Sequence, residues 1–220
     1  ATNWSDNLSQ HIRGTYGKSS CYAVSTALKA VEDAGLDLKT LDQGRVAVIM
    51  GTTMGEAEVE ETITRMVCSG EECSKEIYQK YPASNIVQAI AQELGVKGHL
   101  YVVPAACAAG NYAISIGKML LENNIVDIVI AGGVDVFSYV SFAGFQRLLS
   151  LTPDLCRPFD KNRNGLVIGE GCGIIVMERE KDRSHQKIYG KILGTGLASD
   201  AYHMTSPKIN GEGEIQAMTE

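Results

Sequence analysis

The chain has 220 residues, of which 45% are hydrophobic and 21% are charged. This length and composition are typical of a globular protein with one substantial core or two small ones, and they argue against disorder. The net charge of -6, with no clustered stripe of Lys and Arg, argues against nucleic acid as a partner, because neutralising phosphates requires grouped basic side chains.

No stretch approaches the roughly 20 uninterrupted apolar residues that span a bilayer. Residues 1–6 lack the basic and apolar regions of a signal peptide, so we expect a cytoplasmic protein without a membrane partner. The six cysteines are scattered along the chain, and without a secretory signal we expect them to be reduced. Cys68 and Cys73 lack a second pair of ligands, so we expect neither zinc there nor any other metal or cofactor.

In chain order, apolar residues at helical spacing predict a first helix over residues 19–34. A short β-branched run over residues 45–53 predicts a buried strand. Two further helices are predicted over residues 56–68 and 84–94, the second ending at Gly95.

The next segment predicts a strand over residues 100–106, a helix over residues 111–123 and a strand over residues 127–133. A strand–helix–strand unit implies parallel strands. Residues 167–177 and 187–197 predict two more strands that meet as a hairpin through a charged turn.

These elements indicate an α/β protein in which a mostly parallel sheet is sandwiched by helices. No repeat, low-complexity tract or linker interrupts the sequence, so we expect one domain over residues 1–220. The 23 glycines do not form a nucleotide-binding motif, and the cluster at residues 165–173 indicates close backbone packing instead.

Cys107 is the most informative residue of the chain. It follows the apolar strand at residues 100–106 and precedes a run of small residues that leads into a helix. A thiol at a strand-to-helix turn lies near the positive end of the helix dipole, where the nucleophilic thiolate is favoured. Such a turn suits a catalytic nucleophile, although a lone cysteine after an apolar strand is more often a buried structural residue.

Six motifs stand in order along the chain, and they read Val-Pro-Ala-Ala-Cys-Ala-Ala-Gly (103 to 110), Val-Ile-Ala-Gly-Gly-Val-Asp (129 to 135), Gly-Phe (144 to 145), Arg-Pro-Phe-Asp-Lys-Asn-Arg-Asn-Gly (157 to 165), Gly-Glu-Gly (169 to 171) and Asp-Ala-Tyr-His-Met-Thr-Ser-Pro (200 to 207). Together they resemble the β-ketoacyl-acyl-carrier-protein synthases over about residues 20–207. The resemblance implies a thiolase-like fold, of which this chain is roughly the first, nucleophile-bearing half.

The resemblance implies a decarboxylative Claisen condensation in fatty-acid or polyketide synthesis. Cys107 would take an acyl group from a carrier-protein thioester. Malonyl carrier protein would then lose carbon dioxide, and the carbanion would attack the acyl-cysteine. The implied partners are acyl carrier protein and a second subunit, in a homodimer or a ketosynthase heterodimer.

Other site residues follow from the same resemblance. Met54 and Phe145 match positions that line the acyl tunnel, and Thr205 matches a hydroxyl that meets the pantetheine arm. Each could instead be an ordinary core or turn residue. Four charged residues are expected to support the site as ion pairs, and they are Arg157, Asp160, Arg163 and Glu170.

The family uses two catalytic histidines from its second half, whereas the histidines of this chain are His11, His99, His185 and His203. Only His203 lies in a family motif, at a position outside the catalytic pair, and we expect it to be structural. The family's first strand is also missing. We therefore expect that the isolated chain cannot condense.

Three alternatives stay open. The chain could be a malonyl decarboxylase or other acyltransferase on the same fold. It could be a chain-length-factor-like partner, although such relatives replace the cysteine. It could also be a structural protein whose thiol is buried and inert.

Overall fold

The computed structural model describes residues 8–180, 187–203 and 206–220. The contacts within the chain divide it between residues 184 and 185 into two compact units. We call residues 1–184 the sheet unit and residues 185–220 the C-terminal unit. The single domain expected over residues 1–220 stays a prediction.

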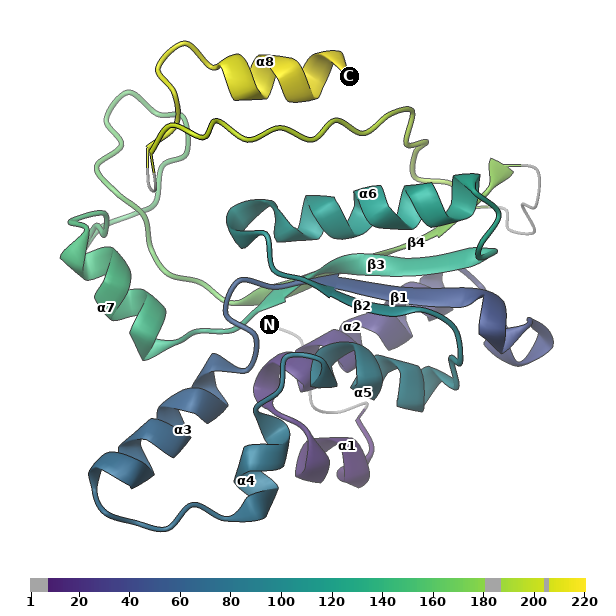
Figure 1. The fold of residues 1–220 in the computed structure, drawn as a ribbon, viewed down its shortest axis with the longest axis horizontal. Helices are drawn as coiled ribbons and strands as arrows, with labels where there is room; N and C mark the ends of the chain where they lie inside the picture. Colours follow the sequence, from purple (N-terminus) through teal and green to yellow (C-terminus); the bar gives the residue numbers. More distant parts are fainter. Residues whose placement is uncertain (1–7, 181–186, 204–205) are drawn as a thin grey trace. The chain divides into compact units, whose positions relative to one another are not determined.

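The sheet unit contains four strands and, in its described part, seven α-helices (Figure 1). The strands are β1 (Val46–Gly51), β2 (Leu100–Val103), β3 (Ile128–Asp135) and β4 (Gly171–Glu178). The helices are α1 (Gln10–Thr15), α2 (Lys18–Asp33), α3 (Ala57–Cys68), α4 (Lys75–Lys80), α5 (Asn85–Leu94), α6 (Ala109–Glu122) and α7 (Tyr139–Arg147).

The strands form one sheet in the order β2-β1-β3-β4. β2 and β3 both pair with β1 in parallel, whereas β4 pairs with β3 in antiparallel orientation. The carboxyl ends of β1, β2 and β3 and the amino end of β4 therefore meet at one edge of the sheet.

Alternating side chains of the central strands supply two apolar cores. Val48 and Met50 of β1 face the core that α2 and α5 share, whereas Ala47 and Ile49 face the core under α6. All six residues of β1 are buried, as expected of a strand covered on both faces. Figure 1 shows α6 on one side of the sheet and α2 with α5 on the other, so the predicted α/β fold is confirmed.

The predicted elements up to residue 133 are confirmed, with ends that differ by up to three residues. The strand predicted over residues 167–177 begins only at Gly171, after a loop. The hairpin is wrong, because residues 187–197 form no strand in the structure. Although they include β-branched and aromatic residues, they carry three glycines and find no strand to pair with among the described residues, and β-propensity depends on such context.

The described part of the C-terminal unit consists of irregular chain followed by the helix α8 (Glu212–Thr219). Gly196 lies against the last turns of this helix, and the Leu197 N–H donates to Glu220 at 3.2 Å. These contacts hold the irregular segment onto α8 within the unit.

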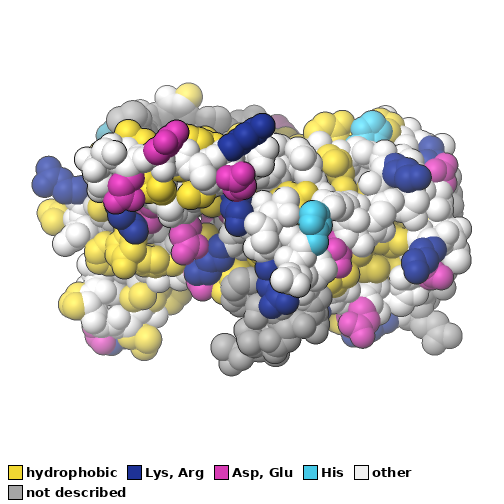
Figure 2. Space-filling model, turned by 90° about the horizontal axis from the view of Figure 1, so that it is seen from below, with side chains coloured by type: hydrophobic (Ala, Val, Ile, Leu, Met, Phe, Trp, Pro, Cys, Tyr) yellow, Lys and Arg dark blue, Asp and Glu magenta, His cyan; other side chains and the backbone are white. Residues whose placement is uncertain are grey.

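Among the described residues, no helix is long and apolar enough to cross a membrane. Within the same residues, no group of three or more His, Cys, Asp and Glu side chains is arranged to hold a metal ion. On the face of the molecule in Figure 2, basic and acidic side chains are interspersed.

Candidate active site

Cys107 lies on a one-turn 3-10 helix (Ala106–Ala108) that joins the carboxyl end of β2 to α6. Its side chain is exposed, and α6 begins two residues later. Ala106 adopts φ 46°, a left-handed conformation that is strained for a residue with a Cβ. The predicted turn between strand and helix is confirmed, and it presents the thiol at the N-terminal end of a 14-residue helix.

Glycine backbones lie beneath this turn. A Cβ at Gly51, the last residue of β1, would lie 2.5 Å from the Gly110 nitrogen and closer still to the Ala109 carbonyl group. Gly133 of β3 also approaches Gly110, at 3.4 Å from a Cβ built on Gly133 to the Gly110 Cα. The first turn of α6 therefore lies directly on the end of β1, where a side chain at Gly51 would displace it, and it lies within van der Waals distance of Gly133 at the end of β3.

A hollow of about 340 Å³ opens beside Cys107. It lies at the edge where the carboxyl ends of the parallel strands meet, which is the usual place for ligands in α/β sheets. Its lining comes from the ends of β1 and β3, the turn before α6 and the loop before β4, and comprises Gly51, Thr53, Ala106, Cys107, Ala109, Gly110, Gly133, Val134, Asp135, Gly169, Glu170 and Gly171.

Glu170 is the one residue among the four predicted supports that lines this hollow. Its carboxylate accepts hydrogen bonds from the Lys18 ammonium at 2.9 Å, the Tyr22 hydroxyl at 2.8 Å and the Phe137 N–H at 3.1 Å. The Lys18 bond, with the Phe137 and Tyr22 bonds, holds the pKa of Glu170 below its ordinary value. Glu170 thus connects the loop before β4 to α2 and to the chain after β3.

The other three predicted supports lie in the loop between α7 and β4. Arg157 pairs with Asp154 at 2.7 Å, and the Arg163 guanidinium donates to the Asp160 carbonyl at 2.9 Å. The Asp160 carboxylate accepts the Asn162 N–H at 2.6 Å. These bonds are local to the loop, none of the three residues lines the hollow, and their role in supporting the site stays a prediction.

Of the three predicted substrate-binding residues, the structure describes Met54 and Phe145. Met54 follows β1 and is half-buried next to Thr53, which lines the hollow. Phe145 is exposed on α7. Thr205 lies outside the described residues. Neither Met54 nor Phe145 lines the hollow, so the tunnel and pantetheine roles stay predictions.

Asp135, the last residue of β3, was not singled out from the sequence, although it lines the hollow. Its carboxylate accepts hydrogen bonds from the Thr52 hydroxyl and from the N–H groups of Thr53 and Met54, at 2.9 to 3.1 Å. A carboxylate at the carboxyl end of an otherwise apolar strand is the signal that could have identified it.

No histidine lines the hollow within the described sheet unit. The His99 residue precedes the first residue of β2, whereas Cys107 follows the other end of that strand. His11 of α1 is hydrogen-bonded to Gln92 at 2.9 Å, away from the lining residues. His185 lies outside the described residues.

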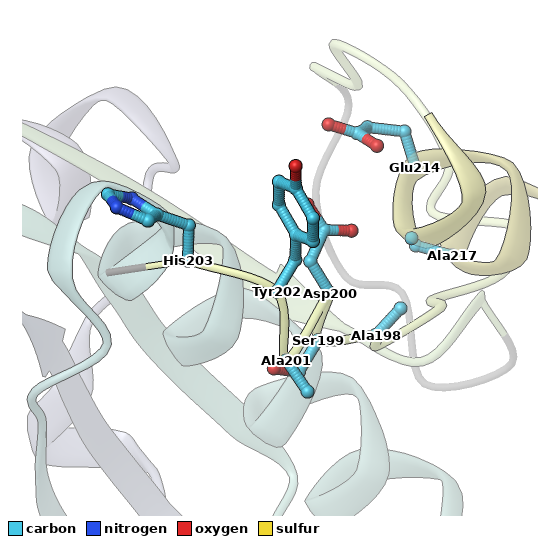
Figure 3. Close-up of a pocket in the computed structure, with 9 residues that line it drawn as sticks. Ala198, Ser199, Asp200, Ala201, Tyr202, His203, Glu214 and Ala217 are labelled. Atoms are coloured by element: carbon cyan, nitrogen blue, oxygen red, sulfur yellow. The ribbon is translucent and has the colours of Figure 1, made fainter. Parts of the chain in front are cut away.

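The C-terminal unit contains a second hollow, of about 710 Å³, between its irregular segment and α8. Figure 3 shows that the side chains of Asp200 and Tyr202 lie on the side of the irregular segment where Glu214 of α8 is found, whereas His203 lies apart from them. Asp200 also accepts the Lys208 N–H at 2.8 Å, which closes a loop within the unit. The structural role expected for His203 stays a prediction.

The model of the "Beta-ketoacyl synthase, N-terminal domain" family matches residues 6–183. This range includes the whole sheet, Cys107 and the loop before β4. The chain belongs to the β-ketoacyl synthase family. The N-terminal domain of the family thus corresponds to the sheet unit.

Curated β-ketoacyl synthases are similar over almost the whole chain. The 3-oxoacyl-[acyl-carrier-protein] synthase 2 of Vibrio cholerae is 32% identical over 210 residues, which cover 90% of this chain and 50% of that protein. The tetracenomycin polyketide synthase ketoacyl synthase alpha subunit of Streptomyces glaucescens is 28% identical, over 97% of this chain and 54% of that protein. The chain thus spans about half the length of these relatives.

Solved ketosynthase structures have the same fold. The ishigamide ketosynthase/chain length factor aligns with a TM-score of 0.86 and 33% identity, over 98% of this chain and 55% of that one. A type II polyketide synthase acyl-carrier protein in complex with its ketosynthase bound to the hexaketide aligns with a TM-score of 0.85 and 26% identity, over 93% of this chain and 54% of that one. The thiolase-like fold expected from the sequence is confirmed for this partial chain.

Proposed function

We propose that Cys107 accepts an acyl group from a carrier-protein thioester, and that the whole protein condenses this group with a malonyl unit. The observation that carries the proposal is the exposed thiol on a strained turn at the N-terminal end of α6, beside a hollow at the sheet edge. The thiolate would attack the thioester carbonyl and expel the carrier thiol, which takes up a proton. The product is an acyl-Cys107 thioester.

The backbone N–H of Cys107 is the proposed donor to the negative charge that develops on the thioester oxygen. The Cys107 N–H lies on the turn that leads into α6, and donors preorganised at a helix N-terminus stabilise an oxyanion. Small residues around the thiol, Ala106, Ala109 and Gly110, leave the sulfur accessible.

Decarboxylation of malonyl carrier protein requires stabilisation of an enolate. Within the described sheet unit, no histidine lines the hollow beside Cys107. We therefore propose that this chain by itself is acylated but does not release carbon dioxide from malonyl carrier protein. In the whole protein, the released carbanion would attack the acyl-Cys107 carbonyl, regenerate the thiolate and give a β-ketoacyl thioester two carbons longer.

An acyl carrier protein is the proposed partner, and this is supported by the similar ketosynthase solved with its own acyl-carrier protein. Assembly with a second ketosynthase-type chain, identical or different, is proposed from two similar ketosynthases solved with a chain length factor. Fatty-acid and polyketide synthesis are both represented among the similar proteins.

The test is incubation with acyl carrier proteins that bear acyl groups of graded length, followed by peptide mapping. We expect one acyl group on the peptide that contains Cys107, and a carbon dioxide release assay with malonyl carrier protein to stay at background. Acylation elsewhere would contradict the assignment of Cys107. Robust carbon dioxide release would contradict the proposal that this chain cannot decarboxylate.

A further inference from the structure

The carboxylate of Asp135 is directed by its hydrogen bonds to the loop that follows β1. Its Oδ1 accepts the Thr52 hydroxyl at 2.9 Å, the Thr53 N–H at 3.0 Å and the Met54 N–H at 2.9 Å. Its Oδ2 lies 3.1 Å from the same Thr53 nitrogen. Two consecutive backbone amides and a hydroxyl of one loop are thus satisfied by one side chain.

Thr52 extends this connection in two directions. Its hydroxyl, which donates to Asp135, also accepts the Gly55 N–H at 2.8 Å, and its own N–H donates to the Val103 carbonyl at 3.2 Å. The Thr52 residue is only 3% exposed, so these groups have little access to water that could replace a lost partner. The ends of β1, β2 and β3 are therefore joined through Asp135 and Thr52.

The joined loop forms one side of the hollow beside Cys107, because Thr53 lines that hollow together with Asp135. Gly55 adopts φ 58°, which lets the chain turn sharply into Glu56 and α3. The loop is therefore fixed at Asp135 on one side and continues into a buried helix start on the other.

We propose that Asp135 is a positioning residue of the Cys107 site, one that fixes the loop over residues 52–55 so that the hollow admits a thioester in a productive orientation. This inference rests on the proposed acyl transfer to Cys107. The hydrogen bonds of the Asp135 carboxylate all run to the loop, so Asp135 acts through Thr53 and the neighbouring backbone and takes no proton from the thiol.

Two substitutions separate the hydrogen bonding of Asp135 to the loop from the effect of its negative charge. Asp135→Ala removes every acceptor from the loop donors. Asp135→Asn keeps one acceptor oxygen, whose two lone pairs can serve most of the donors of Oδ1, and loses the charge. Glu32→Ala, at an exposed position of α2, is the control.

The first measurement is hydrogen exchange of the Thr53 and Met54 amides. We expect protection of these two amides to fall about tenfold in Asp135→Ala and to be largely retained in Asp135→Asn and Glu32→Ala. Unchanged protection in Asp135→Ala would overturn the inference.

The second measurement compares two reagents at Cys107, well below the melting temperature of each variant. In Asp135→Ala we expect acylation by a thioester to slow about tenfold, with a higher half-saturating concentration, and Asp135→Asn to restore most of the rate. Alkylation by iodoacetamide should change less than about twofold, because this small reagent needs no loop.

The outcomes distinguish a failure of the positioning role of Asp135 from a failure of the proposed acyl transfer to Cys107. Equal loss of both reactions would indicate general misfolding and overturn the positioning role, as would unchanged thioester acylation. If the wild-type chain accepts no acyl group, the proposed function fails, and the exchange measurement alone decides whether Asp135 holds the loop.

Discussion

Gly51 at the end of β1 lies directly against Ala109 at the start of α6, so closely that a Cβ on Gly51 would overlap the Ala109 carbonyl group. This backbone-to-backbone contact fixes how closely the turn that carries Cys107 approaches the sheet. The position of Cys107 therefore depends on a residue that is 56 positions away in the sequence and carries no functional group.

Gly51→Ala should lower both the stability of the chain and the acylation of Cys107, although it adds only one methyl group. Both partners in the contact are backbone, so the first turn of α6 must move, and we expect a loss of about 1–3 kcal/mol in the free energy of unfolding. Thioester acylation of Cys107 should fall as well. Urea unfolding and acylation kinetics measure the two effects.

Gly144→Ala is the matched control for this substitution. Gly144 lies in α7 with nothing within 4 Å of an added Cβ, so alanine should leave stability unchanged or raise it by up to about 1 kcal/mol. Equal effects of the two substitutions would show that the contact at Gly51 is not decisive.

The cysteines should differ sharply in their reactivity with iodoacetamide at neutral pH. Burial raises the pKa of Cys21 and of Cys172 to about 11, so both stay protonated and unreactive in the folded chain. Cys107 and Cys156 are both exposed, but only Cys107 precedes a long helix. We expect Cys107 to react about tenfold faster than Cys156. Comparable rates at the two residues, measured by peptide mapping, would show that the N-terminal end of α6 does not increase the reactivity of Cys107.

Glu56 should be important for stability although it lies outside the hollow. Its buried carboxylate accepts the N–H groups of Ser19 and Ser20 at 3.1 and 2.8 Å and the Ser20 hydroxyl at 2.5 Å, at the first turn of α2. Burial raises the pKa of Glu56 even though these bonds oppose the rise.

Glu56→Ala should therefore lower the free energy of unfolding by about 2–4 kcal/mol, because three donors of α2 lose their partner in the interior. Glu58→Ala, at an exposed position in the first turn of the helix α3 that follows Glu56, should change it by less than about 0.5 kcal/mol. A small effect of Glu56→Ala in chemical denaturation would show that water replaces the carboxylate.

The ion pairs of Asp127 should make the free energy of unfolding depend on pH in the acid range. Arg45 binds its carboxylate with two bonds, at 2.6 and 2.8 Å, and Arg179 with one at 2.5 Å, and these bonds lower the pKa of Asp127 to about 2. A pKa below the unfolded value, near 3.8, means that the bonds stabilise the folded chain above about pH 4. This stabilisation is lost as the pH falls from about 4 through about 2.

The comparison of wild type with Asp127→Asn measures this effect. We expect wild type to be more stable at pH 6, by about 1 kcal/mol at most because the carboxylate is 42% exposed. The difference should shrink below about pH 4 and disappear only as the pH falls through about 2. A difference that is as large at pH 2 as at pH 6 would contradict the ion-pair explanation.

The local pattern of the sequence predicted the sheet unit well, for identifiable reasons. Helical spacing and the short apolar runs correctly placed α2, β1, α5 and the strand–helix pair around Cys107, because each of these elements buries an apolar face. The strand expected over residues 187–197 failed because strand formation requires a partner, and no local pattern reports one.

The site was predictable only in part. Cys107 can be identified from its position between an apolar strand and a run of small residues, and Glu170 from its position between two glycines in a family motif. The contacts of Asp135 with the loop after β1 join residues more than 80 positions apart, and they arise only because β1 and β3 pair in parallel. Such a contact depends on topology, which spacing along the chain does not contain.

The most direct test of the central claim is intact-protein mass spectrometry after incubation with an acyl-loaded carrier protein, for wild type, Cys107→Ala and Cys156→Ala. We expect one added acyl group in wild type and in Cys156→Ala, and none in Cys107→Ala. An acyl adduct of the same stoichiometry on Cys107→Ala would contradict that claim.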